Sequence, residues 1–499
     1  MAAAGEGTLK IVAFAGSGKT STLSLLAANA LSGGRGVYLA FNKSIAAAAQ
    51  RSLPSNVTAR TVHSFAGAGV GMPFPTGEHK NISSHLVAKA CGEIWLPDFP
   101  VLTQKRWMAD ALRHFPQSAD AVPGRASVDA VLDVIGILSE IPPDKAEHRQ
   151  LIAKRREAAD RLLSGHLASV WSGIVADRRL WSFEVILKVF ALSPDAVRAA
   201  FSGQRFLMVD ECQDLNGVMR SICSQAAAGR VLVAVGDPWQ QIYSWNGAEN
   251  ALDHMQGKEL YLTQSFRFGW RLADMASRLL ASKPEARPPH PIRGNPARET
   301  WVSMDTVSAH HFPASRGDTV ICRTNAGVLS AAVMAALRGM TIHVVKGLDD
   351  LIAECESGVA LREARNRDVR HPTFLQYADW TEAKIGAEED ANLRRLVDGI
   401  ESGHLAEDLE TVKRAVRPEA TADLRISTAH KTKGLEFKSV ILWSDFATPE
   451  KLAARYEKAL AAKSGRDAAV KAALEEWHVR YVAATRAIDS LTIIEPPRR

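Results

Sequence analysis

The sequence predicts an α/β protein with two lobes, each a sheet of parallel strands flanked by helices, and with helical insertions. The chain has 499 residues, more than the roughly 250–300 residues that one hydrophobic core usually serves. Short apolar runs, typical of strands covered on both faces, occur in two groups far apart along the chain. Longer stretches with helical spacing lie between them.

Four short apolar runs predict the first lobe. Each is followed by polar loop residues, as expected where a strand ends at the edge of a buried parallel sheet. The runs span residues 9–14, 37–41, 206–209 and 231–235. We therefore assign residues 1–84 and 201–255 to this lobe.

A later set of similar runs predicts the second lobe. These runs span residues 319–322, 341–345, 424–427, 440–442 and 491–494. Because they repeat the pattern of the first set, we assign residues 256–345 and 421–499 to a second sheet of the same type.

Two stretches interrupt the lobes. Residues 85–200 are rich in Ala, Leu and Arg, with helical spacing over 126–141 and 151–163, and predict a helical insertion in the first lobe. Residues 346–420 are charged and helical in pattern. They predict a second, short helical insertion.

Composition excludes several classes of protein. No window reaches the eighteen uncharged apolar residues of a membrane span, and the five scattered cysteines form no CxxC pair. A disulfide framework or a zinc site is therefore not expected. The net charge of +6 permits a polyanionic partner. We expect a cytoplasmic protein, nuclear in a eukaryote, with no membrane partner.

The first candidate site is AFAGSGKT at residues 13–20, directly after a predicted strand. In such a loop the backbone N–H groups cradle phosphates, the lysine reaches the β- and γ-phosphates and the threonine hydroxyl binds Mg²⁺. Ala13 replaces the first glycine of the phosphate-loop pattern, and a chance GSGKT turn is the alternative. The predicted nucleotide-binding residues are Ala13, Ala15, Gly16, Ser17, Gly18, Lys19, Thr20 and Ser21.

The second candidate site is DECQD at residues 210–214, which follows another predicted strand. A carboxylate there can hold Mg²⁺, and its neighbour can activate the attacking water. Asp210 suits the first role, together with Thr20, and Glu211 suits the second. An acidic solvated turn is the alternative, although the phosphate loop upstream argues against it.

The order of short motifs resembles that of superfamily 1A DNA helicases, the UvrD/Rep-like family. The motifs are AFAGSGKT, YLAFNKS, TVHSFA, DECQD, VGDPWQQIYSWNGA, LTQSFRF, STAHKTKGLEF and YVAATRA. Their wording resembles most the F-box DNA helicase branch, without an F-box. The resemblance covers about residues 9–494 outside the insertions and implies two RecA-like P-loop lobes that bind ATP and Mg²⁺.

The resemblance assigns further residues to nucleotide hydrolysis. Gln240 matches the glutamine that senses the γ-phosphate, and Glu436 matches the carboxylate that contacts the ribose. Arg267 and Arg486 match two arginines that the second lobe extends toward the γ-phosphate. Such arginines stabilise the charge that develops during phosphoryl transfer.

The resemblance also implies a track for single-stranded DNA. Tyr243 and Trp245 match aromatic residues on which bases stack, with core packing as the alternative. The remaining predicted contacts are polar side chains that grip the strand without reading its sequence: Asn42, Lys43, Thr61, His63, Thr428, His430 and Lys433.

The sequence departs from the family pattern at three points. The first glutamine is Gln50, so no residue matches the upstream glutamine that reads adenine, and we expect ATP to be preferred over GTP by roughly tenfold or less. Asn246 stands where an arginine is usual. The second insertion is shorter than the accessory subdomain of Rep-like enzymes.

These observations predict an ATP-dependent DNA helicase or translocase, and the resemblance implies 3′-to-5′ movement on single-stranded DNA. The implied partners are single-stranded DNA and duplex junctions, with a nuclease on a separate chain as a further partner. One alternative is an ATP-gated DNA-binding or protein-stripping remodeller with little unwinding. A phosphate-loop kinase or GTPase is a weaker alternative, since it has no use for IYSWNGA.

Overall fold

A computed structural model describes most of the chain as two compact units. The described residues are 7–40, 43–72, 81–92, 94–137, 146–244, 247–308, 311–375, 377, 379–389, 391–462 and 466–495. The first unit comprises Met1–Leu262 and Leu460–Ala472, and the second comprises Thr263–Ala459 and Ala473–Arg499.

The first unit is built on a parallel sheet. Among the described residues its strand order is β3-β2-β4-β5-β1-β6, and every described pairing is parallel. The strands are β1 (Gly7–Ala13), β2 (Gly36–Ala40), β3 (Val57–Thr61), β4 (Phe206–Val209), β5 (Val231–Gly236) and β6 (Lys258–Leu262). The carboxyl ends of β1, β4 and β5 carry the predicted nucleotide motifs.

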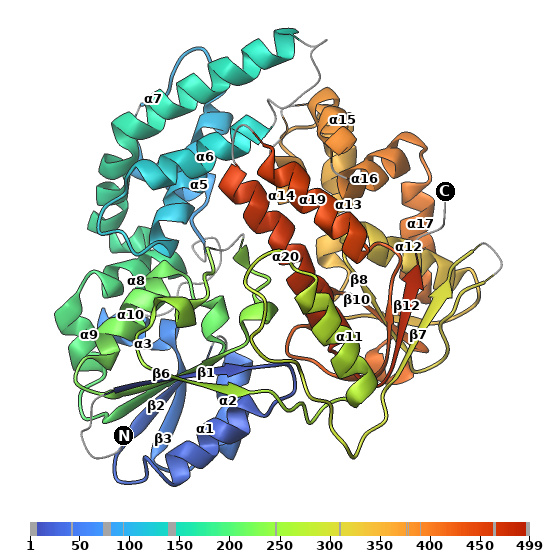
Figure 1. The fold of residues 1–499 in the computed structure, drawn as a ribbon. Coiled ribbons are helices and arrows are strands. Elements are labelled where there is room, and N and C mark those ends of the chain that lie inside the picture. The colour runs from blue at the N-terminus through green and yellow to red at the C-terminus, as the bar shows by residue number, and fades with distance from the viewer. Residues whose placement is uncertain are drawn as a thin grey trace. The chain divides into compact units, whose positions relative to one another are not determined.

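Helices cover both faces of this sheet. Figure 1 shows α1 (Lys19–Ala28) and α2 (Lys43–Ser52) on one face, with α3 (Val62–Gly69), α8 (Phe183–Ala191) and α10 (Gly217–Ala227) on the other. One core joins strand side chains such as Ile11, Tyr38 and Met208 to Leu23 of α1 and Ala46 of α2. Burial of this apolar surface holds the helices on the sheet.

A helical group follows α3 in the same unit. Helices α5, α6 and α7 pack against one another, and α4 packs against α5 and α7. The remaining helices of the unit are α4 (Ser84–Ala90), α5 (Val101–Gln117), α6 (Arg125–Ile137), α7 (Ala146–Ala176) and α9 (Pro194–Ala200). Short 3₁₀ helices are η2 (Arg178–Leu180), η3 (Cys212–Asp214), η4 (Pro238–Gln240) and η6 (Ala251–His254).

The second unit is built on another parallel sheet. Its strand order in the described residues is β7-β12-β11-β8-β10-β9, again with parallel pairings. The strands are β7 (Trp301–Thr306), β8 (Thr319–Cys322), β9 (Ile342–Val344), β10 (Leu424–Thr428), β11 (Phe437–Leu442) and β12 (Ala487–Glu495).

Helices of the second unit pack on this sheet and on one another. Helix α12 packs against β8 and β10, α11 packs against β7, and α16 packs against α13 and α15. The helices are α11 (Trp270–Ala281), α12 (Asn325–Ala336), α13 (Asp349–Arg362), α14 (Pro372–Leu375), α15 (Trp380–Glu389), α16 (Ala391–Glu401), α17 (Leu405–Ala415), α18 (Ala429–Thr432), α19 (Pro449–Leu460) and α20 (Arg466–Ala484), with η7 (Glu419–Thr421) as a 3₁₀ turn.

The predicted fold class is confirmed, with two corrections to the lobe boundaries. The smaller one is that Leu460–Ala472 belongs to the first unit, although residues 421–499 are assigned to the second lobe by the sequence. The sequence assigns residues 256–345 to the second lobe, whereas β6 pairs with β1 of the first sheet. The chain therefore leaves the first sheet after Leu262. The strand escapes the sequence pattern because its residues, KELYL, are exposed or half-buried at the sheet edge.

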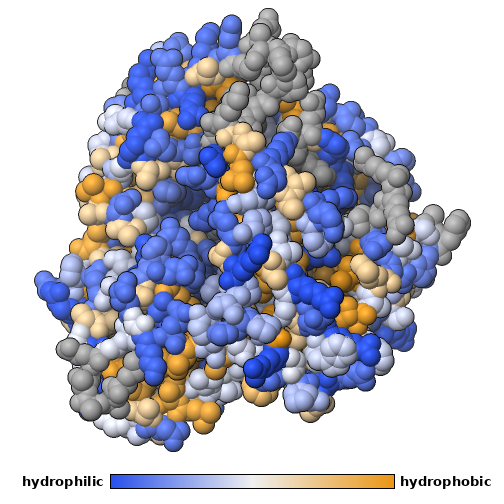
Figure 2. All heavy atoms as spheres, in the orientation of Figure 1, coloured by the Kyte–Doolittle hydropathy of each residue, from blue (hydrophilic) through white to orange (hydrophobic). Residues whose placement is uncertain are grey.

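The surface is mixed in character. On the face drawn in Figure 2, hydrophilic residues cover most of the area and hydrophobic residues lie in small groups between them. None of the helices within the described residues has the length and apolar composition needed to cross a membrane.

Candidate active site

The phosphate loop joins the end of β1 to the start of α1. Gly16 and Gly18 adopt φ angles of 70° and 78°, in the left-handed region that favours glycine. Helix α1 then begins with Lys-Thr-Ser-Thr, a first turn without an acidic side chain. Because the first N–H groups of a helix have no intrahelical acceptor, this loop and helix start favour an anion.

Ser17 shows that the loop fits a phosphate group. Its backbone N–H donates to the carbonyl of Phe14 at 3.2 Å, which closes the loop. Its hydroxyl oxygen is buried and has no hydrogen-bond partner among the described residues. A buried donor without an acceptor is costly, and a phosphate oxygen in the loop would supply that acceptor.

Asp210 lies directly after β4 and is buried. Its Oδ1 accepts a hydrogen bond from the backbone N–H of Glu211 at 2.9 Å, and its Oδ2 accepts one from the hydroxyl of Tyr38. Burial raises the pKa of Asp210 to about 6, the charge of Glu211 adds to the increase, and Lys19 opposes it. A cation beside Asp210 would relieve this unfavourable burial of charge.

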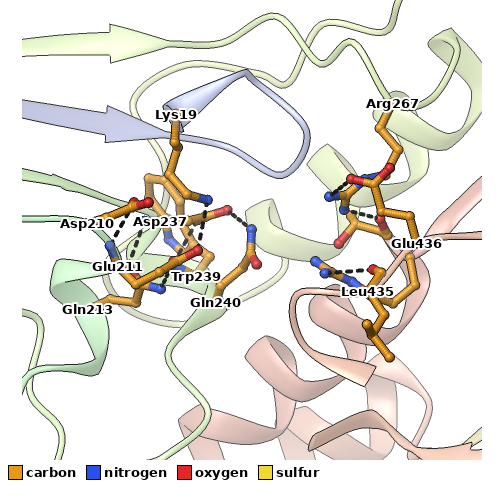
Figure 3. Close-up of polar contacts among 12 residues, drawn as sticks. Lys19, Asp210, Glu211, Gln213, Asp237, Trp239, Gln240, Arg267, Leu435 and Glu436 are labelled. Carbon is orange, nitrogen blue, oxygen red and sulfur yellow. Dashed lines mark hydrogen bonds and ion pairs between the residues drawn. The ribbon is translucent and has the colours of Figure 1, made fainter. Parts of the chain in front are cut away.

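Glu211 connects the carboxylates to the phosphate loop. Its Oε1 lies 3.7 Å from Nζ of Lys19, and its Oε2 accepts a hydrogen bond from Nε2 of Gln213 at 2.6 Å. Figure 3 shows the three side chains converging from α1 and from the segment after β4. The structure thus brings the predicted phosphate-binding lysine and the predicted base together.

A hydrogen-bonded chain extends from Gln213 to Gln240. Oε1 of Gln213 accepts from the backbone N–H of Asp237 at 3.0 Å, and Oδ2 of Asp237 accepts from Nε2 of Gln240 at 2.6 Å (Figure 3). The ring of Trp239 stacks on Phe14 with centroids 5.0 Å apart. The predicted γ-phosphate sensor is therefore held by the same network as the predicted base.

The residues present suit Mg²⁺ bound together with a nucleotide. Among the described residues, no group of three or more His, Cys, Asp or Glu side chains could hold a metal ion by itself. Mg²⁺ is usually held by one or two carboxylates together with substrate phosphates and water. Asp210 and the hydroxyl of Thr20 provide such a partial set, and Mg²⁺ would neutralise phosphate charge.

The second unit holds both predicted arginines in one polar cluster. Arg267 donates from Nη2 to Oε1 of Glu436 at 2.6 Å and from Nη1 to the carbonyl of Thr485 at 2.7 Å (Figure 3). Its Nε is buried without a partner among the described residues. Arg486, which is 1% exposed, donates from Nη1 to the carbonyl of Leu435 at 3.2 Å.

The predicted DNA contacts of the first unit lie at several places after the strands. Lys43 begins α2, and Thr61 caps α3 by accepting a hydrogen bond from the N–H of Ser64 at 3.2 Å. Burial lowers the pKa of His63, whose ring packs edge-on against Phe183. Tyr243 is half-buried. Asn42 and Trp245 lie outside the described residues, as does Asn246.

In the second unit a cavity of about 350 Å³ opens beside β8 and β10. Thr428 and His430, both predicted, line it, whereas Lys433 does not. The neighbouring strand places Arg323 and Asn325 on the same wall, because Thr428 pairs with Cys322 in the sheet. The acidic side chains of Asp350 and Glu354 accept hydrogen bonds from Asn325 there.

Sequence reasoning missed several members of these sites. In the first unit they are Tyr38, Gln213 and Asp237, which fall inside quoted motifs but received no role. In the second unit Arg323 and Asn325 follow the predicted strand 319–322 directly. Polar residues after that strand were the available signal, since the carboxyl ends of neighbouring parallel strands meet at one edge of a sheet.

Comparisons with known families agree with this geometry. The sequence model of the UvrD/REP helicase N-terminal domain matches residues 167–256, and that of the UvrD-like helicase C-terminal domain matches residues 376–496. The chain is thus similar to both domains of UvrD-like helicases. The first match includes Asp210, Glu211 and Gln240, and the second includes Glu436 and Arg486.

Curated relatives share this resemblance over most of the chain. F-box DNA helicase 1 of Gallus gallus is 27% identical over 96% of the chain and 46% of its own length. F-box DNA helicase protein 1 of Schizosaccharomyces pombe is 25% identical over 96% and 54%, and ATP-dependent DNA helicase PcrA of Staphylococcus epidermidis is 24% identical over 57% and 39%. The chain spans about half the length of the F-box relatives.

Proposed function

We propose that the chain is an ATP-dependent DNA helicase or translocase that moves 3′-to-5′ on single-stranded DNA. One observation carries the proposal: the buried Asp210 and the Lys19–Glu211 pair, 3.7 Å apart, stand at the phosphate loop. That arrangement supports nucleotide hydrolysis. The UvrD-like domains and the DNA helicases among the relatives support DNA as the substrate.

Binding of ATP uses the loop after β1. Backbone N–H groups of residues 15–21 and Nζ of Lys19 hold the phosphates, and the hydroxyl of Ser17 gains the acceptor that it lacks. Thr20 and Asp210 would hold Mg²⁺ bound to the nucleotide. Nζ of Lys19 lies 3.7 Å from Oε1 of Glu211, so the same lysine links the phosphates to the predicted base.

Hydrolysis then depends on the orientation of Glu211. The hydrogen bond from Gln213 fixes one carboxylate oxygen, and the other, 3.7 Å from Nζ of Lys19, would accept the proton of the attacking water. Asp237 holds Gln240, whose amide senses the γ-phosphate. A change in the position of Gln213 or Gln240 would shift the other glutamine as well, because both are hydrogen-bonded to Asp237.

Arg267 and Arg486 of the second unit complete the reaction in this proposal. Arg267 is paired with Glu436, the residue that the family resemblance assigns to the ribose. A ribose hydroxyl that binds Glu436 weakens this pair and frees the guanidinium for the γ-phosphate. The negative charge that develops there is then stabilised by arginine.

DNA binding uses polar groups in both units. Thr428, His430, Arg323 and Asn325 contact the sugar–phosphate backbone at the cavity of the second unit. The hydroxyl of Thr428 and the amide of Asn325 can donate hydrogen bonds to phosphate oxygens, whereas the carboxylates of Asp350 and Glu354 on the same wall repel them. In the first unit Lys43, Thr61 and Asn42 serve the same strand, and Tyr243 and Trp245 stack on bases.

The test is ATP hydrolysis with and without a single-stranded oligonucleotide. We expect severalfold stimulation by single-stranded DNA and weaker stimulation by blunt duplex. Arg267→Lys should bind ATP normally and lose hydrolysis, because lysine keeps the charge and loses the planar guanidinium. Hydrolysis unaffected by DNA would overturn the assignment of a DNA motor, and hydrolysis unaffected in Arg267→Lys would overturn the role of that arginine.

A further inference from the structure

Tyr38 is a buried tyrosine whose hydroxyl lies at the nucleotide site. It stands in the middle of β2 and is 0% exposed. Its ring belongs to the core between the first sheet and α1 and α2, together with Leu23 and Met208. Packing accounts for the ring, but it does not account for a hydroxyl in a place that would otherwise suit phenylalanine.

The hydroxyl bridges two segments of the candidate site. It donates a hydrogen bond to Oδ2 of Asp210, after β4, and it also interacts with the side-chain hydroxyl of Thr20, in the first turn of α1. Strand pairing fixes this geometry, because Tyr38 lies opposite Met208 and the N–H of Asp210 donates to the carbonyl of Leu39 at 3.2 Å.

Both partners of the hydroxyl are the residues assigned above to Mg²⁺. A hydroxyl has one proton and two lone pairs, so Tyr38 can donate to the carboxylate and accept from Thr20 at once. Burial raises the pKa of Tyr38 far above its ordinary value, and the charge of Asp210 adds to this increase. The hydroxyl therefore offers Asp210 a hydrogen-bond donor.

We propose that Tyr38 is a positioning residue, which holds the carboxylate of Asp210 and the hydroxyl of Thr20 in the arrangement that receives ATP-bound Mg²⁺. The inference rests on the proposed function. Without the phenol, Asp210 keeps the N–H of Glu211 on one oxygen only, and the carboxylate can rotate about its χ2 torsion. The side chain would then have to be reoriented each time the metal binds.

The test is Tyr38→Phe, which keeps the ring and removes the hydroxyl. Binding of a fluorescent ATP analogue is measured in EDTA and across a Mg²⁺ titration. We expect an unchanged affinity in EDTA, since the phosphate loop is intact, and a Mg²⁺ half-saturation raised about tenfold, equivalent to about 1.4 kcal/mol. Saturating Mg²⁺ should restore most of kcat.

The matched control is Tyr261→Phe. Tyr261 lies on β6 of the same sheet, and its hydroxyl donates to the carboxylate of Glu259, which also pairs with Lys10. This control loses an equivalent hydrogen bond without touching Asp210, so its Mg²⁺ titration should match the parent. Thermal unfolding in EDTA checks that each variant is folded, and Tyr38→Met replaces Tyr38→Phe if the latter is not.

The outcomes separate this inference from the function on which it rests. A parent protein that binds no nucleotide in the presence of Mg²⁺ would overturn the proposed function itself. If the parent binds and Tyr38→Phe shows the same Mg²⁺ dependence, Tyr38 is a core residue only. An equal loss of affinity in EDTA and in Mg²⁺ would likewise contradict a role at the metal ligands.

Discussion

Glu211 has a left-handed backbone conformation, which residues with a Cβ atom rarely adopt. Its φ angle of 51° is left-handed, which costs about 1–3 kcal/mol in a residue other than glycine when the surroundings enforce it. The conformation turns the chain sharply after β4, so that Asp210 and Glu211 face the phosphate loop in succession. Gln213 and Lys19 hold the resulting position of the carboxylate.

Substitutions at Glu211 and Lys19 should separate the loss of ATP hydrolysis from the loss of ATP binding. Glu211→Gln should lower kcat by about 10²–10⁴-fold, the usual contribution of a general base, while ATP affinity is kept. Lys19→Ala should lose affinity, because the phosphates lose their cationic partner. Single-turnover hydrolysis and a fluorescent nucleotide titration measure the two effects. A Glu211→Gln variant that turns over near the parent rate would show that another group is the base.

Asp210 makes stability depend on pH. Its pKa of about 6 in the folded protein lies above the ordinary aspartate value of about 3.9. The folded state thus holds the proton more tightly than the unfolded state between these two values. This contribution to stability is therefore fully present below about pH 4 and is lost as pH rises through about 6.

We therefore predict that Asp210→Asn stabilises the nucleotide-free protein in EDTA. The gain should grow between about pH 4 and 6 and level off above pH 7 at about 1–3 kcal/mol, because asparagine carries no charge to bury. Thermal unfolding across pH measures it, with the exposed Asp253→Asn as the control. A variant less stable than the parent at pH 8 would contradict the burial penalty.

At the scale of elements, the sequence predicted central strands better than edge strands. Central strands such as β4 and β5 are continuous apolar runs, because helices cover both faces. The strands β3, β6 and β7 were not predicted, and each lies at the edge of its sheet. Edge strands are partly exposed, so their residues alternate or turn polar and the apolar pattern is lost.

The apolar pattern of the central strands also explains which residues of the candidate site could be predicted from the sequence. Lys19, Asp210 and Gln240 stand in motifs directly after predicted strands, so the topology alone brings them together. Tyr38 was missed because it points from inside a strand and looks like core. The Arg267–Glu436 pair joins residues that are 169 positions apart, and no sequence spacing encodes such a contact.

A glycine at the start of β2 tests the packing between β2 and β4. A Cβ on Gly36 would lie 2.0 Å from the ring of Phe206, which is buried in the core. Gly36→Ala should therefore cost about 1–3 kcal/mol through overpacking. Gly33→Ala is the control, since its Cβ meets nothing within 4 Å.

The midpoint of thermal unfolding, Tm, measures the stability of Gly36→Ala and Gly33→Ala. For a unit of this size, each kcal/mol shifts Tm by roughly 2–4 °C. We expect a lower Tm for Gly36→Ala and an unchanged or slightly higher one for Gly33→Ala, because alanine restricts the unfolded chain. Equal midpoints for the two variants would show that Phe206 moves aside without cost.

At the scale of the whole molecule, the functional groups are divided between two units. The first holds the phosphate loop, the carboxylates and Gln240, and the second holds Arg267, Arg486 and Glu436. In the proposed function both sets serve one reaction, so hydrolysis requires both units and can be tied to a change between them. Coupling of this kind turns an ATPase into a motor.

The most direct test of this account is strand separation on duplexes with either a 3′ or a 5′ single-stranded tail. We predict ATP-dependent unwinding of the 3′-tailed duplex, none of the 5′-tailed duplex, and none of either by Glu211→Gln. Unwinding from the 5′ tail alone would contradict the direction. Failure on both duplexes, with hydrolysis still stimulated by single-stranded DNA, would contradict the helicase and leave a translocase or remodeller that does not separate strands.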